Sequence, residues 1–397
     1  MMHFKFDQIS RTRITRKATV IGSAIALMFS ASAMAQAIGS PASNLQAERG
    51  GPFSTSQSGG GMPTPLSRFE VADTITGITT PHGINVMPVQ KKLWVANVSM
   101  NTASRIDIGS GDVETVVPVG QGPDLIATDK LRQKVWITNL KGNSVSVLNA
   151  DTGAELARIP VGKEPHGLAI DQARGRVYVT NYKDNTVFVF DGQTNQKLKS
   201  IAVGKGPRNI SLDALTGNIF VSNMDENTVS LVNPQRGVEL ARMKVGIKPA
   251  GMDFNMITRT LYVSNTGSSN VSVLRNGNEI KKIPVGTNPR GIQVNLMTNQ
   301  VFVNVVGEGK VAVVDGFTDR IREKVKVGEG NYVSSLDITT NTLYVANQSS
   351  NSISVVRPGT DAGSTSGGPM PGFFDRAGAG GRSGISADGI VESMMNR

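Results

Sequence analysis

Short apolar segments recur along most of the chain, and polar turn residues separate them. In one stretch four such segments follow one another: "HGLAID", "VYVTN", "TVFVF" and "KLKSIAV". They are rich in β-branched and aromatic residues, and the intervening "QARGR", "YKDN" and "DGQTN" are typical of turns. The pattern therefore predicts four short β-strands. The third segment is apolar on both sides, so we expect both of its faces to be covered.

This four-strand unit repeats seven times in a constant register. The second strand of each copy carries one aromatic residue, at intervals of 42 except for a single interval of 40: Trp94, Trp136, Tyr178, Phe220, Tyr262, Phe302 and Tyr344. A "VG" pair follows with the same spacing, ending at Gly120, Gly162, Gly204, Gly246, Gly286 and Gly328. Seven units of four strands predict a seven-bladed β-propeller of class all-β over residues 68–358.

The sequence also predicts how the ring closes. The last copy ends after three strands, "YVSSLDI", "LYVAN" and "SISVV", whereas "RFEVADTIT" precedes the first copy. We expect this N-terminal strand to complete the seventh blade and so protect two sheet edges.

The repeated "YVTN", "TVSV" and "IPVG" resemble the YVTN-type β-propeller repeat family, over nearly the whole repeated region. The resemblance implies the propeller fold. It implies no single activity, because the family includes cell-surface proteins and heavy subunits of quinone-cofactor amine dehydrogenases.

The two ends differ from the repeats. Residues 1–35 combine a basic leader, the apolar "ATVIGSAIALMFSASA" and the small-residue site "AMA", which predict a cleaved signal peptide and a periplasmic or secreted protein. Residues 36–67 are rich in Ser, Gly and Pro, and residues 359–397 are rich in Gly. We expect a flexible linker and a flexible tail there. No membrane span is expected after signal cleavage.

Composition excludes several kinds of site. The chain has no cysteine, which excludes disulfides, c-type haem and thiolate metal ligands. Its formal net charge is +10, of which the signal segment contributes a large share. The remaining basic residues are scattered singly, so we do not expect a nucleic-acid partner.

Most repeated turn residues have structural explanations. We expect the Gly of each "VG" to supply a backbone angle that a β-carbon hinders. The Pro three residues later, as at Pro165, restricts the start of the innermost strand. Asp171, Asp213 and Asp337 suit Asx-type turns that bond to local backbone. The same turn is expected for the Asn that closes most second strands: Asn97, Asn139, Asn181, Asn223, Asn265 and Asn347.

One position repeats in place but varies in kind. The residue after that Pro, or its equivalent in the last copy, is in turn His82, Asp124, His166, Arg208, Ala250, Arg290 and Tyr332. Since innermost strands begin at the mouth of a propeller channel, these side chains should form a ring there. The neighbouring Gly and small residues, Ala127, Ala169, Ser211 and Ser335 among them, suggest that little room remains.

We interpret this ring as a ligand-binding site. Arg208 and Arg290 would hold a carboxylate or phosphate, and Tyr332 would donate a hydrogen bond. The alternative is a solvated polar rim around a water-filled hole. No cofactor is predicted, although His82, Asp124 and His166 together would suit a divalent metal.

Binding is favoured over catalysis, because the chain has no nucleophile elbow, HExxH or phosphate loop. The expected role is a binding or scaffold protein for a protein or cell-envelope partner, or for a small anionic ligand. The alternatives are a propeller enzyme of lactonase or lyase type, with His82 or His166 as general acid or base, and a subunit of a periplasmic dehydrogenase complex.

Overall fold

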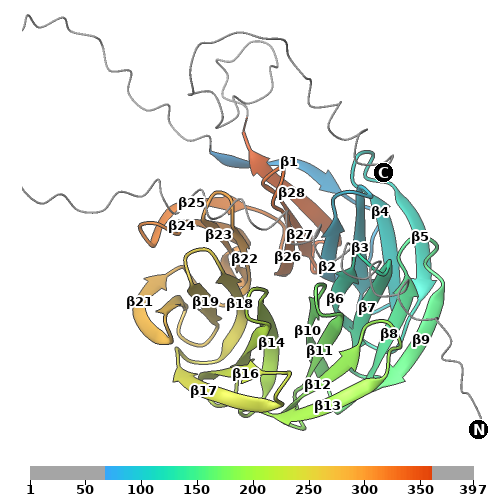
Figure 1. Ribbon diagram of the computed structural model, residues 1–397. Helices are drawn as coiled ribbons and strands as arrows, with labels where there is room; N and C mark the ends of the chain where they lie inside the picture. The colour runs from blue at the N-terminus through green and yellow to red at the C-terminus, as the bar shows by residue number, and fades with distance from the viewer. Residues whose placement is uncertain (1–67, 360–397) are drawn as a thin grey trace, which may run out of the picture. The chain divides into compact units, whose positions relative to one another are not determined.

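The computed structural model describes residues 68–359, which form seven four-stranded antiparallel sheets around a central axis (Figure 1). The predicted signal peptide, the linker and the tail beyond Gly359 lie outside the described residues. None of the described elements is a helix of the length and apolar character needed to cross a membrane.

Each blade uses its strands in chain order from the axis outward. The innermost strands are β2 (Pro81–Met87), β6 (Pro123–Asp129), β10 (Pro165–Asp171), β14 (Pro207–Asp213), β18 (Pro249–Asn255), β22 (Pro289–Asn295) and β26 (Asn331–Asp337). The second strands are β3 (Lys92–Asn97), β7 (Lys134–Asn139), β11 (Arg176–Asn181), β15 (Asn218–Asn223), β19 (Thr260–Asn265), β23 (Gln300–Val305) and β27 (Thr342–Asn347).

The outer half of each blade follows the same order. The third strands are β4 (Thr102–Asp107), β8 (Ser144–Asn149), β12 (Thr186–Asp191), β16 (Thr228–Asn233), β20 (Asn270–Arg275), β24 (Lys310–Asp315) and β28 (Ser352–Pro358). The outer strands are β5 (Val113–Pro118), β9 (Glu155–Pro160), β13 (Lys197–Ala202), β17 (Val238–Lys244), β21 (Asn278–Pro284), β25 (Arg320–Lys326) and β1 (Phe69–Ile75). A short 3₁₀ turn, η1 (Val306–Glu308), joins β23 to β24.

The seventh blade confirms the predicted closure. It consists of β26, β27 and β28 from the C-terminal end and β1 from the N-terminal end. β1 pairs antiparallel with β28, from Phe69 opposite Pro358 to Ile75 opposite Ile353. Phe69 packs edge-on against Phe302 of the preceding blade, with ring centroids 5.2 Å apart. The first strand therefore joins the two ends of the propeller and also contributes to the core.

The core lies between adjacent sheets. The seven aromatic residues of the second strands are all buried, and Trp94 and Trp136 are completely inaccessible, as core packing requires. Each apolar cluster takes residues from two neighbouring blades; one contains Tyr178 and Val187 of blade 3 with Ile210 and Val221 of blade 4. Because each sheet is covered on both faces by its neighbours, no blade forms a core alone.

The "VG" glycines have a different role from the one expected. Among them only Gly286 has a positive φ, so a special backbone angle does not explain the others. A β-carbon on Gly204 would lie 2.4 Å from Cγ of Asn223, and the same clash with an Asn recurs at Gly120, Gly162, Gly246 and Gly328. Glycine is required there because the closing Asn of the second strand occupies the space.

The closing Asn residues do not form Asx turns with local backbone, so that prediction was wrong. The amide of Asn223 donates to the hydroxyls of Thr228 at 3.0 Å and Ser230 at 2.8 Å on the third strand. Asn97, Asn139 and Asn347 bond in the same way, and Asn265 donates to the side-chain oxygens of Asn270 and Ser272. The predicted Asx turn does occur at Asp337, which accepts from the backbone of Thr339.

The backbone just before the innermost strands is held by the preceding blade. The residue before each first position has a positive φ: Thr80, Gly122, Glu164, Gly206, Lys248, Asn288 and Gly330. The backbone N–H of Glu164, for example, donates to Asn143 of the blade before it at 2.9 Å. These links fix the point at which each innermost strand turns into the channel mouth.

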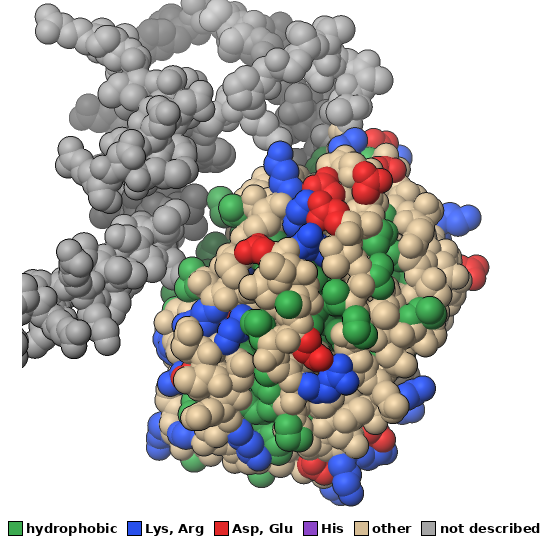
Figure 2. Space-filling model, turned by 90° about the vertical axis from the view of Figure 1, so that its right-hand side faces the viewer, with side chains coloured by type: hydrophobic (Ala, Val, Ile, Leu, Met, Phe, Trp, Pro, Cys, Tyr) green, Lys and Arg blue, Asp and Glu red, His purple; other side chains and the backbone are tan. Residues whose placement is uncertain are grey.

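The surface is mixed in charge. On the face shown in Figure 2, Lys and Arg side chains are interspersed with Asp and Glu. This face has no massed basic patch of the kind that nucleic-acid binding requires.

We predict that Gly204→Ala lowers the free energy of unfolding by about 1–3 kcal/mol, because its methyl group overlaps Asn223. Asn223→Ala also destabilises, through loss of its two hydrogen bonds. The double variant should be more stable than the sum of the two single effects implies, since removing the amide relieves the overlap. Urea unfolding of the four proteins measures the coupling; strictly additive effects would contradict this explanation.

Candidate functional site

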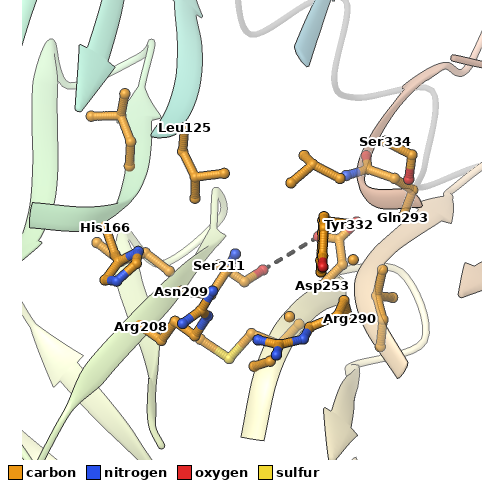
Figure 3. Close-up of a pocket in the computed structure, with 18 of the residues that line it drawn as sticks. Leu125, His166, Arg208, Asn209, Ser211, Asp253, Arg290, Gln293, Tyr332 and Ser334 are labelled. Atoms are coloured by element: carbon orange, nitrogen blue, oxygen red, sulfur yellow. Dashed lines mark hydrogen bonds between the residues drawn. The ribbon is translucent and has the colours of Figure 1, made fainter. Parts of the chain in front are cut away.

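All seven positions of the predicted ring lie at the mouth of the channel. Each is the second residue of an innermost strand. Together they line one cavity of about 340 Å³: His82, Asp124, His166, Arg208, Ala250, Arg290 and Tyr332. The expectation of little room holds between neighbouring innermost strands, where a β-carbon on Gly83 or Gly251 would clash with the carbonyl oxygen of Asp124 or Arg290 in the next blade. The open space is the cavity that the ring side chains surround. Figure 3 shows Arg208, Arg290 and Tyr332 directed into the same space.

Blades 1 to 3 contribute a linked group of two histidines and one carboxylate. Nδ1 of His166 lies 2.7 Å from one oxygen of Asp124, and Nε2 of His82 lies 3.1 Å from the other. Burial raises the pKa of the Asp124 carboxyl, but the hydrogen bonds from His166 and then His82 outweigh it and hold that pKa below its usual range. Asp124 is therefore ionised, and both of its oxygens are occupied.

Blades 4 and 6 contribute two cations. The guanidinium of Arg208 donates to the sulfur of Met224 at 3.9 Å, and Nε of Arg290 donates to Asn288 at 3.1 Å. Within residues 68–359 neither guanidinium forms an ion pair. Burial, followed by the charge of Arg208, lowers the pKa of Arg290 from its ordinary value. Both groups stay protonated at neutral pH because arginine loses its proton only in strong base.

Aromatic rings connect the two halves of the mouth. Tyr332 lies between them: its ring centroid is 5.4 Å from that of His82 and 5.9 Å from the guanidinium carbon of Arg290. On the other side Tyr182, from the turn after β11, packs edge-on against His166 at 5.6 Å. Its hydroxyl donates to Asp225 at 2.9 Å. These contacts restrict both imidazole rings.

A second ring of side chains lies three residues further along each innermost strand, deeper in the channel. Only its alanine and serine members were predicted from the sequence. Its positions are Asn85, Ala127, Ala169, Ser211, Asp253, Gln293 and Ser335. Asp253 is half-buried and links three blades: it accepts from Ser211 at 3.3 Å and from the backbone of Val294 at 2.9 Å (Figure 3). Burial raises its pKa to about 6, although these bonds and that from Phe254 oppose the rise. The repeat register, followed three residues beyond each first-ring position, would have identified Asp253 from Ala250.

The geometry does not favour metal binding by His82, Asp124 and His166. The nitrogens nearest the carboxylate are hydrogen-bonded to it, so its oxygens are already engaged. Among the residues that the structure describes, no cluster of three or more His, Asp or Glu side chains is arranged to hold a metal ion.

Comparisons with known proteins place the fold. The NHL repeat family matches residues 163–190. Among solved structures, hydrazine synthase of Kuenenia stuttgartiensis has a TM-score of 0.64 and 18% identity, covering 71% of this chain and 96% of that chain. Virginiamycin B lyase from Staphylococcus aureus has a TM-score of 0.63 and 15% identity, covering 73% and 99%. A streptogramin B lyase has a TM-score of 0.63 and 13% identity, covering 74% and 98%. Among curated proteins none matches.

The protein is a β-propeller repeat protein. At these identities the similarity establishes the fold alone. The NHL match lies within one blade, over β10, β11 and most of β12, and supports a propeller repeat without distinguishing the YVTN type from others.

We predict that Asp253 makes folding depend on pH. Its pKa of about 6 in the folded protein exceeds the ordinary value, so its contribution is fully present below pH 4 and is lost as pH rises through 6. Between pH 7 and pH 5 this group should add about 1 kcal/mol to the free energy of unfolding. Asp253→Asn should lack that increment in denaturant titrations at the two pH values; an unchanged increment would refute the assignment.

Proposed function

We propose that the protein binds a small anionic ligand at the channel mouth, with Arg208 and Arg290 as the anion-holding groups. The observation that carries this proposal is the pair of guanidinium groups in one cavity without a carboxylate partner. The carboxylate of the same ring, Asp124, is already bonded to two histidines. A bound anion would supply the missing charge.

The chemistry of the site suits a ligand that carries a carboxylate or a phosphate. A guanidinium binds two oxygens of either group at once. The cavity of about 340 Å³ suits a small molecule rather than a folded domain. Asn209, Gln293 and Ser334 line the same cavity and offer neutral polar groups for the rest of the ligand.

We also propose a repeat family, a cellular location and a kind of partner for the protein. The repeat motifs support a YVTN-type propeller, and the N-terminal segment supports export to the periplasm or beyond. In that setting the turns beside the mouth would present the ligand site to a protein or cell-envelope partner. The polar sequences "NLKGNS" and "NMDENT" are examples of these turns.

We predict that Arg208→Ala and Arg290→Ala each weaken binding of an anionic probe at least tenfold, because each removes a charge-assisted contact. Calorimetric titration with citrate and with inorganic phosphate measures this. Arg208→Lys should retain part of the affinity, since it keeps the charge and loses the planar fork.

Arg236→Ala is the matched control, because Arg236 is exposed in an outer turn between β16 and β17. It should bind the probes like the wild type. Equal weakening in the control and in the ring variants would indicate a general charge effect and would contradict the site.

The second candidate function is a propeller enzyme, and the bonded His82–Asp124–His166 group favours it. An ionised carboxylate accepts from protonated ring nitrogens, so His166 carries its proton on Nδ1. The other nitrogen, Nε2, is then free to act as a base, with Asp124 holding the imidazole in place. This arrangement would serve a lyase or lactonase reaction; a role as a subunit of a dehydrogenase complex would use the mouth for contact instead.

We expect a bound ligand to remain chemically unchanged if the protein is a binding protein. NMR spectra of each ligand that binds, recorded over a day with stoichiometric protein, test this. Conversion that is abolished in His166→Gln, while binding persists, would establish the enzyme instead.

A further inference from the structure

A third ring of equivalent residues lies at the opposite end of the disc. It occupies the turns between the innermost and second strands, which the pairing of each blade places away from the channel mouth. One turn position has the same register in every blade: Val89, Leu131, Ala173, Leu215, Ile257, Met297 and Thr339. Five of the seven are large apolar residues, and Ile338 stands beside Thr339.

These side chains are unusually exposed for apolar residues. Val89 is 90% accessible, Met297 74% and Leu131 70%. Phe317, in an outer turn on the same face, is also exposed. The turns at the channel mouth contribute only Met100 and Ile247 to the exposed large apolar residues of the described part of the chain. The two faces of the disc therefore differ in character.

The charges of this ring have one sign. The seven turns, 88–91, 130–133, 172–175, 214–217, 256–259, 296–299 and 338–341, contain five cations and no acidic residue. Arg132, Arg174 and Arg259 pair with aspartates that lie buried at the ends of innermost strands. Lys91 and Lys130 are exposed and form no ion pair within residues 68–359. The exposed acids Asp112 and Asp151 lie in outer turns of the same face.

The repeat also predicts that the tips of these seven turns form an even ring. A turn of four residues follows every innermost strand, so we expect the seven tips to lie at a similar height along the axis. Only a flat partner contacts all of them at once. A second disc stacked face to face would oppose cations with cations.

We propose that this face docks on the surface of an anionic lipid bilayer. The aliphatic tips would enter the interface between headgroups and acyl chains, and Lys91 and Lys130 would meet anionic headgroups. The channel mouth would then face away from the membrane, open to its ligand. This inference does not rest on the anion site, which uses other residues at the other end of the channel.

Sedimentation of the full chain with vesicles tests the proposal. Vesicles of phosphatidylethanolamine and phosphatidylglycerol should carry the protein down, and phosphatidylcholine vesicles should carry far less. Leu131→Glu combined with Met297→Glu should reduce partitioning at least tenfold, since it places negative charge at two tips. Met100→Glu combined with Ile247→Glu, on the channel-mouth face, is the matched control and should partition like the wild type.

A spectroscopic readout locates the contact. The chain has no cysteine, so Met297→Cys and Ile247→Cys each give one position for an environment-sensitive dye. Vesicles should shift the emission to the blue at position 297 and leave it unchanged at position 247. Citrate binding should be the same in all these variants, so failure here leaves the anion site unaffected.

Three outcomes would overturn the proposal. Absence of vesicle binding by the wild type is one, and equal loss in the tip and control variants is another. The third is a concentration-dependent dimer that the tip variants dissociate, because it would assign the ring to a second copy of the chain.

Discussion

Coverage of each blade by its neighbours is the constraint on which this structure depends. A sheet with apolar side chains on both faces is stable only when both faces are packed, and here that packing comes from the adjacent sheets. The requirement holds for every blade, so the ring must close. β1 meets it by completing the seventh blade beside β28, and Phe69 carries the core across the junction to Phe302.

The same constraint explains why some positions carry similar residues in all seven repeats while others differ in chemistry. Positions between sheets, such as Trp136 and Val177, are limited by the space between blades. The second residue of each innermost strand lines the cavity at the channel mouth instead of the space between sheets. The fold therefore accepts His, Asp, Arg, Ala or Tyr at that position, while its backbone stays in register.

Electrostatics divides the mouth into two halves. Two imidazoles are hydrogen-bonded to the carboxylate of Asp124, so this carboxylate does not pair with the arginines on the other side of the mouth. Arg208 and Arg290 are left with only weak or neutral contacts in a partly buried cavity, where a cation gains most from a bound anion. The carboxylate of Asp253, deeper in the channel, accepts hydrogen bonds from two neighbouring blades. Within the described residues it forms no ion pair with Arg208 or Arg290.

Sequence alone determined the architecture, because the repeat reports a local unit of four strands copied in one register. The blade number, the closing strand and the gathering of His82, Arg208 and Arg290 into one ring all follow from spacing. Only the tertiary structure decided which ring members bond to each other, since the ring order does not specify how far each side chain reaches. The bridge from Asp124 to both histidines and the hydrogen bonds of Asp253 to two neighbouring blades depend on such distances. The pairing of Gly204 with Asn223 also required the structure, because residues 19 positions apart meet only after the strands have folded back on one another.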